Sequence, residues 1–396
     1  MTALEPDARA AVLLTQQLVR LRTVNERGAE QVEAPAAAVV ADLMRSFGWD
    51  VTVTEVAAGR PNVVAVIDGG RLGRTLMFEG HTDVVTEGDR AGWSFDPFGG
   101  DIVGGRLRGR GSADMKSGVA SMIYAARAVQ QARFAGRMIV AVLVDEEEMM
   151  LGATAFAGSE LAASGIDGVI VCEPEGGEIC PIAKGAMRIR ITFTGLMAHG
   201  AMPQHGRNPI AALGPLLLGL TELGGQIAGS LGTHPQLGEF YLTPTVLVAG
   251  SAEQINVIPA TATVMLDVRT IPGVTHPAVL HLISRLAGQI ADESGLSYDV
   301  EVLVDRPVVN TPVDASVVQA LAAAHLDITG QDPVFGGVPG TTDGTILTRD
   351  AGLQTVVYGP GGKWIAHQAD EFVAVADIES ATRVYARAAQ LFLAGT

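Results

Sequence analysis

Cysteine and lysine are scarce in this chain of 396 residues. Its two cysteines, Cys172 and Cys180, are too few for a disulfide framework and cannot form a thiolate zinc site. Lysine occurs only at Lys116, Lys184 and Lys363, so arginine carries most of the positive charge. These absences exclude a disulfide-rich or cysteine-ligated protein and indicate a reducing compartment.

An excess of positive charge and long apolar runs are also absent. The formal net charge of −16 at pH 7 makes a nucleic-acid backbone or an anionic membrane an unexpected partner. No apolar run free of Gly, Pro and charge reaches the roughly 20 residues of a membrane-spanning helix, and Leu216–Leu220 comes nearest. Met1–Asp7 has neither a basic region nor an apolar core, so no signal peptide is expected. We therefore expect a cytoplasmic protein without a nucleic-acid or membrane partner.

The order of apolar segments predicts an α/β protein with an inserted second domain. Hydrophobic residues make up 48% of the chain, which suits a packed α/β fold, and the length is comfortable for two domains. Short apolar strands alternate with helical patterns up to residue 183. From Lys184 the pattern changes, because Met187–Phe193 alternates apolar and polar residues as an antiparallel strand does. We predict a main domain in two parts, residues 1–183 and 305–396, and a ββαβ-type α+β insert at 184–304.

The segment Met138–Val144 is apolar and ends abruptly in four consecutive acids, Asp145 to Glu148. Such a run is typical of a buried strand of a parallel sheet. Four carboxylates at its end would repel one another unless cations lie between them, which favours a metal site. The same acids would also suit the first turn of a solvated helix, where they interact well with the helix dipole. This stretch alone leaves both interpretations open.

Further potential ligands follow other apolar segments. In open α/β sheets, ligands bind at the carboxyl ends of the strands, so residues far apart in sequence can converge there. Three segments each deliver a candidate at that end: Thr75–Phe78 before His81, Gly168–Val171 before Glu173, and Leu353–Tyr358 before His367.

Asp83 and Asp114 complete the candidate set. On an extended segment Asp83 lies on the same side as His81, where its carboxylate can accept the second ring N–H of a metal-ligating histidine. On their own, these acids could equally be a turn residue and a helix cap. Mixed histidine and carboxylate ligands suit Zn²⁺, Co²⁺ or Mn²⁺ better than Ca²⁺. A two-metal site about 3.5–4 Å wide needs one bridging carboxylate and about two further protein ligands for each metal. The set that supplies them is His81, Glu147, Glu173 and His367 with Asp114 as the bridge, which leaves Glu146 as a base.

These segments resemble the M20 family of co-catalytic zinc amidohydrolases, which includes acetylornithine deacetylase, succinyl-diaminopimelate desuccinylase, aminoacylases and glutamate carboxypeptidase. The matching segments follow the family's order over nearly the whole chain: 78–83, 109–118, 145–153, 172–174, 194–208, 256–269, 340–344 and 359–372. The resemblance implies a zinc-exopeptidase-like fold, with a mixed, mainly parallel sheet flanked by helices. It also implies that residues 1–183 and 305–396 form the catalytic domain and that the insert is a ferredoxin-like lid and dimerisation domain.

The resemblance implies a role for each matching residue. Two zinc ions per subunit, replaceable by Co²⁺ or Mn²⁺, would be held by His81 and Glu173, by Glu147 and His367, and by Asp114 between them. Asp83 would orient His81, and Glu146 would be the general base. The family also carries a cis peptide after its bridging aspartate, here between Asp114 and Met115.

The register of the glutamates is set by their neighbours. Three consecutive glutamates allow two base–ligand pairings, 146 with 147 or 147 with 148. In the family this pair directly follows an aspartate, and a glycine lies five residues beyond the ligand. Asp145 and Gly152 both select the first pairing.

Four further matches concern the substrate. His199 matches an insert histidine that reaches the active site of the partner subunit, where it donates to the substrate carboxylate or to the developing oxyanion; this implies a homodimer. Asn256 and Arg269 match insert residues that bind the substrate carboxylate, and Thr342 matches a loop residue with a similar substrate-binding role.

The implied activity is hydrolysis of an N-acyl amino acid by metal-activated water, with Glu146 moving the proton. The alternative within the family is a metallo-dipeptidase or carboxypeptidase acting on a short peptide, because Arg269 suits any substrate with a free carboxylate. A remote alternative is a non-catalytic, metal-free binding protein on the same scaffold. A serine hydrolase is excluded, because the sequence from Gly111 to Asp114 is not a nucleophile elbow.

Overall fold

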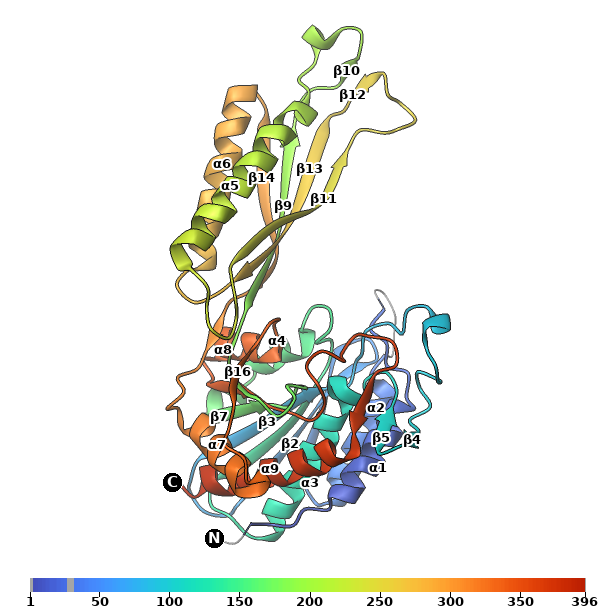
Figure 1. Ribbon diagram of the computed structural model, residues 1–396, viewed down its shortest axis with the longest axis vertical. Helices are drawn as coiled ribbons and strands as arrows, with labels where there is room; N and C mark the ends of the chain where they lie inside the picture. The colour runs from blue at the N-terminus through green and yellow to red at the C-terminus, as the bar shows by residue number, and fades with distance from the viewer. Residues whose placement is uncertain (1–2, 27–31, 396) are drawn as a thin grey trace. The chain divides into compact units, whose positions relative to one another are not determined.

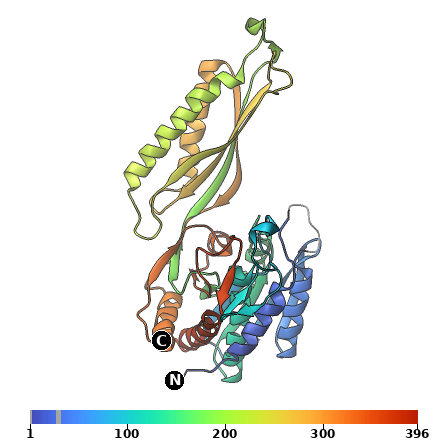
Figure 2. The ribbon, with the colours of Figure 1, turned by 45° about the vertical axis from the view of Figure 1, so that its right-hand side comes forward.

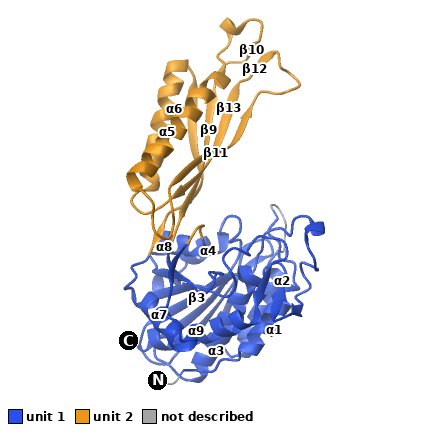
Figure 3. Ribbon diagram, in the orientation of Figure 1, with its two compact units in different colours: residues 1–182, 311–337, 342–396 blue, residues 183–310, 338–341 orange. Residues whose placement is uncertain are grey.

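The computed structural model describes residues 3–26 and 32–395 (Figure 1), so Met1 and Thr2 of the N-terminal segment lie outside the described residues. The chain divides into two compact units (Figure 3). Unit 1 comprises Met1–Ile182, Thr311–Gly337 and Thr342–Thr396, and unit 2 comprises Ala183–Asn310 and Val338–Thr341. Unit 2 is therefore an insertion in the sequence of unit 1.

Unit 1 is built on a mixed sheet with a parallel centre. Its four central strands are β6 (Arg137–Leu143), β3 (Thr75–His81), β7 (Gly168–Val171) and β17 (Thr355–Val357). Antiparallel pairing extends this centre through β2 (Arg60–Asp68) on β6, β1 (Asp50–Ala57) on β2, and β8 (Ile179–Ala183) on β17. β16 (Phe335–Val338) pairs with β8. Every residue of β3 and β7 is buried, as in a sheet covered on both faces. The predicted α/β class is confirmed.

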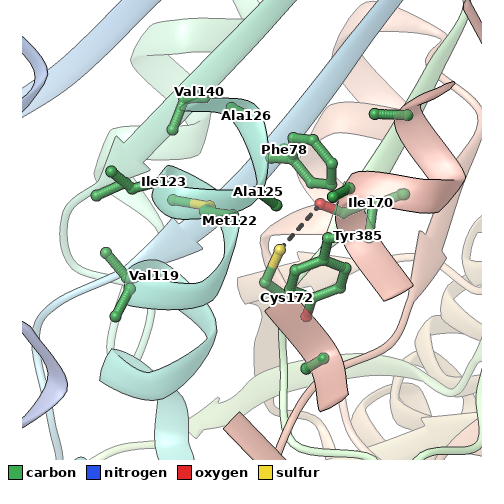
Figure 4. Packing of buried hydrophobic residues seen from close by; sticks show 14 of the residues in the cluster. Phe78, Val119, Met122, Ile123, Ala125, Ala126, Val140, Ile170, Cys172 and Tyr385 are labelled. Atoms are coloured by element: carbon green, nitrogen blue, oxygen red, sulfur yellow. Dashed lines mark hydrogen bonds between the residues drawn. The ribbon is translucent and has the colours of Figure 1, made fainter. Parts of the chain in front are cut away.

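Helices form a layer on each face of this sheet. One layer contains α1 (Ala8–Val19), α2 (Ala34–Ser46), α3 (Ser117–Gln131), α7 (Ser316–Thr329) and α9 (Val375–Leu393). The other contains α4 (Leu151–Ala157) and α8 (Asp343–Ala351), which pack against each other. Figure 4 shows the core beneath the first layer, where Phe78 of β3, Met122 of α3 and Tyr385 of α9 are buried together. The sheet edge that carries the candidate ligands is therefore held by packing on both sides.

A small antiparallel sheet ties two loops of unit 1 together. It consists of β18 (Phe372–Ala374), β5 (Arg106–Arg108) and β4 (Ile102–Val103). Phe372 pairs with Arg108, and just beyond this pair the Gly109 N–H donates to the Glu371 carbonyl at 2.9 Å. This pairing fixes the loop before α3 against the segment that follows His367.

Unit 2 has a four-stranded antiparallel sheet with two helices on one face (Figure 2). The strands, in spatial order, are β11 (Tyr241–Ala249), β13 (Thr261–Thr270), β9 (Gly185–Thr194) and β14 (Ser297–Arg306). The helices are α5 (Leu213–Leu231) and α6 (His276–Ser294). The alternation predicted for β9 is confirmed, because Ile189, Ile191 and Phe193 are buried whereas Arg188 is exposed.

The helical segment Pro209–Leu231, a 3₁₀ turn followed by α5, is apolar and long enough to cross a membrane by length and composition. This segment does not count as an uninterrupted apolar run in the sequence, because Gly, Pro and Glu residues interrupt it. Leu213, Leu216 and Leu220 are buried at helical spacing, and Leu218 between them is 74% exposed. This one-sided burial is typical of an amphipathic helix lying on a sheet.

Candidate metal centre

Three neighbouring strands of unit 1 end beside one another. His81 is the last residue of β3, the pair Glu146–Glu147 follows β6, and Glu173 follows β7. Because β6, β3 and β7 are adjacent and parallel, their carboxyl ends meet at the same edge. Asp114 reaches this edge from the turn before α3, and His367 from the loop after β17.

His81, Glu146 and Glu173 form one buried group, with one ligand atom from each lying within 4.8 Å of the others. His81 Nε2 is 3.2 Å from Glu173 Oε1 and 3.9 Å from Glu146 Oε2. The His81 side chain is only 1% exposed. This group offers one imidazole nitrogen and two carboxylates to a single point.

Asp114, Glu147 and His367 form a second group of the same kind. His367 Nε2 is 3.1 Å from Glu147 Oε2 and 3.2 Å from Asp114 Oδ2. The other Asp114 oxygen, Oδ1, is 3.6 Å from His81 Nε2. Asp114 therefore presents one oxygen to each group, as a bridging carboxylate does. The Asp114–Met115 peptide is cis, as the resemblance implied.

The donor atoms of both groups fit metal cations. His81 Nε2 and Glu147 Oε1 are buried and have no hydrogen-bond partner among the described residues. The other His81 nitrogen, Nδ1, lies 3.0 Å from the carbonyl oxygen of Asp83, which can only accept a hydrogen bond, so Nδ1 carries a proton. Nε2 faces the carboxylates of Glu173 and Asp114, which raise the pKa of the ring well above 6.5 against the effect of burial, so this position suits a proton or a metal cation. A mixture of imidazole and carboxylate donors suits Zn²⁺, Co²⁺ or Mn²⁺.

The crowded carboxylates shift one another's protonation. Burial raises the pKa of Glu146 well above its usual 4.5, and the charges of Glu173 and Glu147 add to this effect. Burial also raises the pKa of Glu173 to about 8, helped by the charge of Asp114. Hydrogen bonds to Asp114 and Glu147 raise the pKa of His367 to about 11. Protons thus take the place of cations in the metal-free protein, and metal binding would release them.

Asp83 contacts more than the histidine it is predicted to orient. Its carboxylate Oδ1 is 3.4 Å from His81 Nδ1, slightly farther than its own carbonyl oxygen. The same carboxylate accepts the backbone N–H groups of Glu146 at 3.3 Å and Glu147 at 3.2 Å. Asp83 therefore connects the histidine end of β3 to the backbone of the two glutamates.

Thr342 also lies in unit 1, at the start of α8. Its hydroxyl accepts the Gly344 N–H at 3.2 Å and caps the helix, and the residue is 5% exposed. Its contacts among the described residues are those of a helix cap.

The remaining predicted residues lie in unit 2. His199 ends the short strand β10 (Ala198–His199), which pairs with β12 (Val257–Ile258) directly after Asn256. The Asn256 carbonyl accepts the Gly200 N–H at 2.6 Å. The structure therefore brings His199 and Asn256 together on neighbouring segments, with both residues exposed.

Arg269 lies on β13, where Asp267 orients it. Its Nε donates to Asp267 Oδ1 at 2.6 Å and its Nη2 to Oδ2 at 3.1 Å. A bidentate pair holds the guanidinium plane in one direction. The side chain is 33% exposed, so its remaining N–H groups can bind a carboxylate.

Glu371 is part of the site although the sequence analysis did not select it. It is completely buried, and its Oε1 accepts the backbone N–H groups of Ala113 at 3.0 Å and Asp114 at 3.2 Å. Its Oε2 pairs with the Arg110 guanidinium. In the sequence, Glu371 is marked only by its position four residues after His367, and the ligand pattern used to select candidates does not extend that far.

A third cluster, Glu175, Glu178 and Cys180, has metal-like spacing but already contains a cation. Lys363 Nζ lies 2.6 Å from Glu175 Oε2 and 2.9 Å from Glu178 Oε2. This cluster is an ion-pair network and offers no competing metal site.

The chain is similar to known proteins over most of its length. The model of peptidase family M20/M25/M40 matches residues 77–391. A protein of Ruegeria sp. named succinyl-diaminopimelate desuccinylase 2 is 33% identical over 95% of this chain and 93% of its own. A succinyl-diaminopimelate desuccinylase of Methylibium petroleiphilum is 34% identical over 97% of this chain and 98% of its own.

Solved structures share the fold at lower identity. Aminopeptidase PepT from Bacillus cereus superposes with a TM-score of 0.78 at 18% identity, covering 98% of this chain and 100% of that one. A dinuclear metal-binding M20 peptidase from Bacillus subtilis gives a TM-score of 0.74 at 19% identity, covering 98% and 100%.

Proposed function

Because this chain belongs to peptidase family M20/M25/M40, we propose that it is a two-metal hydrolase that cleaves the amide bond of an N-acyl amino acid. The observation that carries the proposal is the pair of ligand groups joined by Asp114. In this proposal unit 1 is the catalytic domain, and unit 2 is the lid and dimerisation domain.

The proposed ligands are His81 and Glu173 for one ion, Glu147 and His367 for the other, and Asp114 for both. We assign Zn²⁺ as the native ion, with Co²⁺ or Mn²⁺ as substitutes, because all three accept mixed nitrogen and oxygen ligands. When bound, such ions lower the pKa of water toward about 7 and polarise the amide carbonyl.

Glu146 is the proposed general base. It lies in the same buried group as His81 and Glu173 but is the residue farthest from His81 Nε2, at 3.9 Å. Its carboxylate removes a proton from the attacking water and then delivers that proton to the nitrogen of the leaving amine. Positive charge at the site favours the ionised carboxylate that the first of these steps requires.

Substrate recognition is assigned to four residues. Arg269, oriented by Asp267, binds the free carboxylate of the substrate, and Asn256 and Thr342 assist. His199 donates a hydrogen bond to the oxyanion as the carbonyl is attacked, which stabilises the transition state more than the substrate. Following the family resemblance, this histidine is supplied by the other subunit of a homodimer.

The proposed homodimer is supported by an exposed apolar edge. β11 is an edge strand of the unit 2 sheet, and its Val246, Leu247 and Val248 are 43%, 52% and 58% exposed. Exposed apolar edge strands pair readily with another chain. Sedimentation velocity tests the dimer, and a monomer at all concentrations would remove the role of His199 in the neighbouring active site.

The substrate class is tested by a metal-replete screen with mass-spectrometric product identification. The two relatives reported above are named desuccinylases, so N-succinyl amino acids are the first choice, followed by N-acetyl amino acids. The net charge of −16 supports the proposed absence of nucleic-acid and anionic-membrane partners. Cytoplasmic location is also part of this proposal.

A dipeptidase or carboxypeptidase is the second candidate, because a solved relative of the same fold is described as a metal-binding peptidase. Turnover of dipeptides without turnover of N-acyl amino acids would favour it. A purified chain that contains no metal and stays inactive after addition of Zn²⁺ or Co²⁺ would instead indicate a non-catalytic binding protein.

A further inference from the structure

Two buried aspartates hold the turn that carries Glu146 and Glu147. Asp83 and Asp145 are 0% and 2% exposed. Asp83 accepts the backbone N–H groups of both glutamates. Asp145 has a left-handed backbone with φ of +67°, and its Oδ2 accepts the N–H of Met149 at 3.3 Å. The turn is therefore fastened at both ends by carboxylates.

Asn25 links these two carboxylates. Its Nδ2 donates to Asp83 Oδ2 at 2.8 Å and to Asp145 Oδ1 at 2.9 Å. Ionised carboxylates only accept hydrogen bonds, so the amide NH₂ group, with its two protons, must face them. The Asn25 backbone N–H also donates to the Val84 carbonyl at 2.8 Å, which anchors the residue beside β3.

The charge balance around Asp145 explains why a neutral donor is placed there. Arg60 Nη1 donates to Asp145 Oδ1 at 2.8 Å, but the same guanidinium also pairs with the fully buried Glu33. One cation thus serves two carboxylates, and Asp83, whose Oδ1 lies 3.4 Å from His81 Nδ1, shares that histidine with the candidate metal site. The two N–H groups of Asn25 satisfy both aspartates without adding charge, whereas an unsatisfied buried carboxylate is costly.

We propose that Asn25 is a positioning residue of the hydrolytic reaction. By joining Asp83 to Asp145 it fixes the turn so that Glu146 stays with His81 while Glu147 stays with Asp114 and His367. The inference rests on the proposed function, because it assumes that Glu146 is the base and Glu147 a metal ligand.

The test compares two substitutions that separate hydrogen bonding from space filling. N25D keeps the shape of the side chain but replaces the donor with a third carboxylate, whereas N25A removes the side chain. We expect N25D to lower kcat by about 10- to 100-fold, the range typical of residues that orient metal ligands, with KM changed less than about twofold. N25A should lower kcat less than N25D. A residue that merely fills space would give the reverse order, because the isosteric variant would be the milder one.

The matched control is N208D. Asn208 is exposed in unit 2, and its Oδ1 accepts the Ile210 N–H at 3.0 Å, a role that aspartate performs equally well. This variant should keep the wild-type kcat. The melting temperature of the metal-free proteins tests the bridge independently of activity, and we expect N25D to melt below N25A.

The outcomes separate the two proposals. A wild-type protein that is inactive on every substrate overturns the proposed function. An active wild type with unchanged kcat in N25D, or with N25A slower than N25D, overturns the positioning role of Asn25.

Discussion

Glu146 and Glu147 are consecutive in the chain but lie in different ligand groups: Glu146 with His81 and Glu173, and Glu147 with Asp114 and His367. The backbone at this point is turned so that neighbouring side chains diverge, and both N–H groups donate to Asp83. This arrangement would allow Glu146 to transfer protons while Glu147 binds a metal ion.

The first prediction follows from this divergence. Glu146→Gln should lower kcat by at least about 100-fold, the usual scale of a general base, and should keep both metals. Glu147→Gln should lose metal, because its carboxylate faces His367. Metal analysis of the dialysed variants, together with steady-state rates, measures both effects.

Glu148→Gln is the matched control for these glutamates, because the residue lies outside both ligand groups. It should stay within about threefold of the wild-type rate, on the scale of typical surface substitutions. If it were as damaging as Glu147→Gln, the assigned register of the acidic run would be wrong.

Removal of metal is the second prediction. Prolonged chelation should abolish turnover, and Zn²⁺, Co²⁺ or Mn²⁺ should restore it with a stoichiometry of two per chain. The metal-free protein should also melt at a lower temperature, because a ligand that binds only the folded state stabilises it. Elemental analysis and thermal denaturation provide the measurements, and full activity in metal-free protein would contradict the two-metal assignment.

The third prediction concerns Glu371. Its two oxygens serve different partners, the N–H groups of Ala113 and Asp114 on one side and Arg110 on the other. Glu371→Gln has only one acceptor oxygen, so one side is left without a partner, and metal affinity should fall by about 10- to 100-fold. Competition with a chromophoric chelator measures this loss.

Glu301→Gln is the control for Glu371→Gln. Glu301 is also paired with an arginine, Arg190, at 2.6 Å, but its side chain is 50% exposed. Exposed pairs contribute little to stability, so this variant should bind metal as the wild type does. Equal losses in the two variants would show that the effect is not specific to Glu371.

The fourth prediction concerns Arg269. Arg269→Ala should raise KM by about tenfold or more for substrates with a free carboxylate, with a smaller change in kcat, as expected when ground-state binding is lost. Arg269→Lys should recover only part of this loss, because lysine cannot form a bidentate pair. Arg190→Ala, on the neighbouring strand, is the control, and a substrate whose carboxylate is esterified should be insensitive to all three changes.

The fifth prediction is a pH dependence of stability from His325, far from the metal ligands in sequence. Burial lowers the pKa of this histidine below 6.5, and its Nδ1 lies 3.1 Å from the Tyr358 hydroxyl. As the pH falls below 6.5 the unfolded chain takes up a proton that the folded chain resists, so this contribution to stability is lost toward low pH.

His325→Gln should therefore lose less stability than the wild type between pH 7.5 and pH 5.5, as measured by denaturant unfolding at both values. His281→Gln, at an exposed histidine of α6, is the control and should follow the wild type. Parallel pH profiles for the wild type and His325→Gln would contradict the assignment.

Strong periodicity made much of the fold predictable. The apolar runs of β3, β6 and β7 and the alternation of β9 each carry a pattern that one backbone geometry explains. Helices α3 and α9 have the long buried apolar faces that give rise to a helical period in the sequence. α8 was not predicted, because it is short and its first residues, Asp343, Gly344 and Thr345, suggest a loop. β14 is not predicted from the sequence. It is an edge strand whose residues are exposed or only partly buried, so burial constrains their pattern only weakly.

The candidate ligands could be selected because each directly follows a recognisable strand or matches a family segment. The residues that hold these ligands in place could not be selected from the sequence. Asn25 lies in a loop without periodicity, and its two partners are 58 and 120 residues away. Glu371 acts on backbone groups more than 250 positions earlier in the chain. Such contacts depend on the folded geometry and leave no local pattern.

The position of β17 determines when during synthesis this site can be completed. Residues 355–357 occupy the place between β7 and β8, although both of those strands are translated long before. Until they emerge from the ribosome, the central sheet has an open slot, and His367 follows later still. The nascent chain therefore carries all three proposed carboxylate ligands, Asp114, Glu147 and Glu173, before the second proposed histidine ligand is made. A truncation before residue 355 would remove an interior strand of the sheet rather than a dispensable tail.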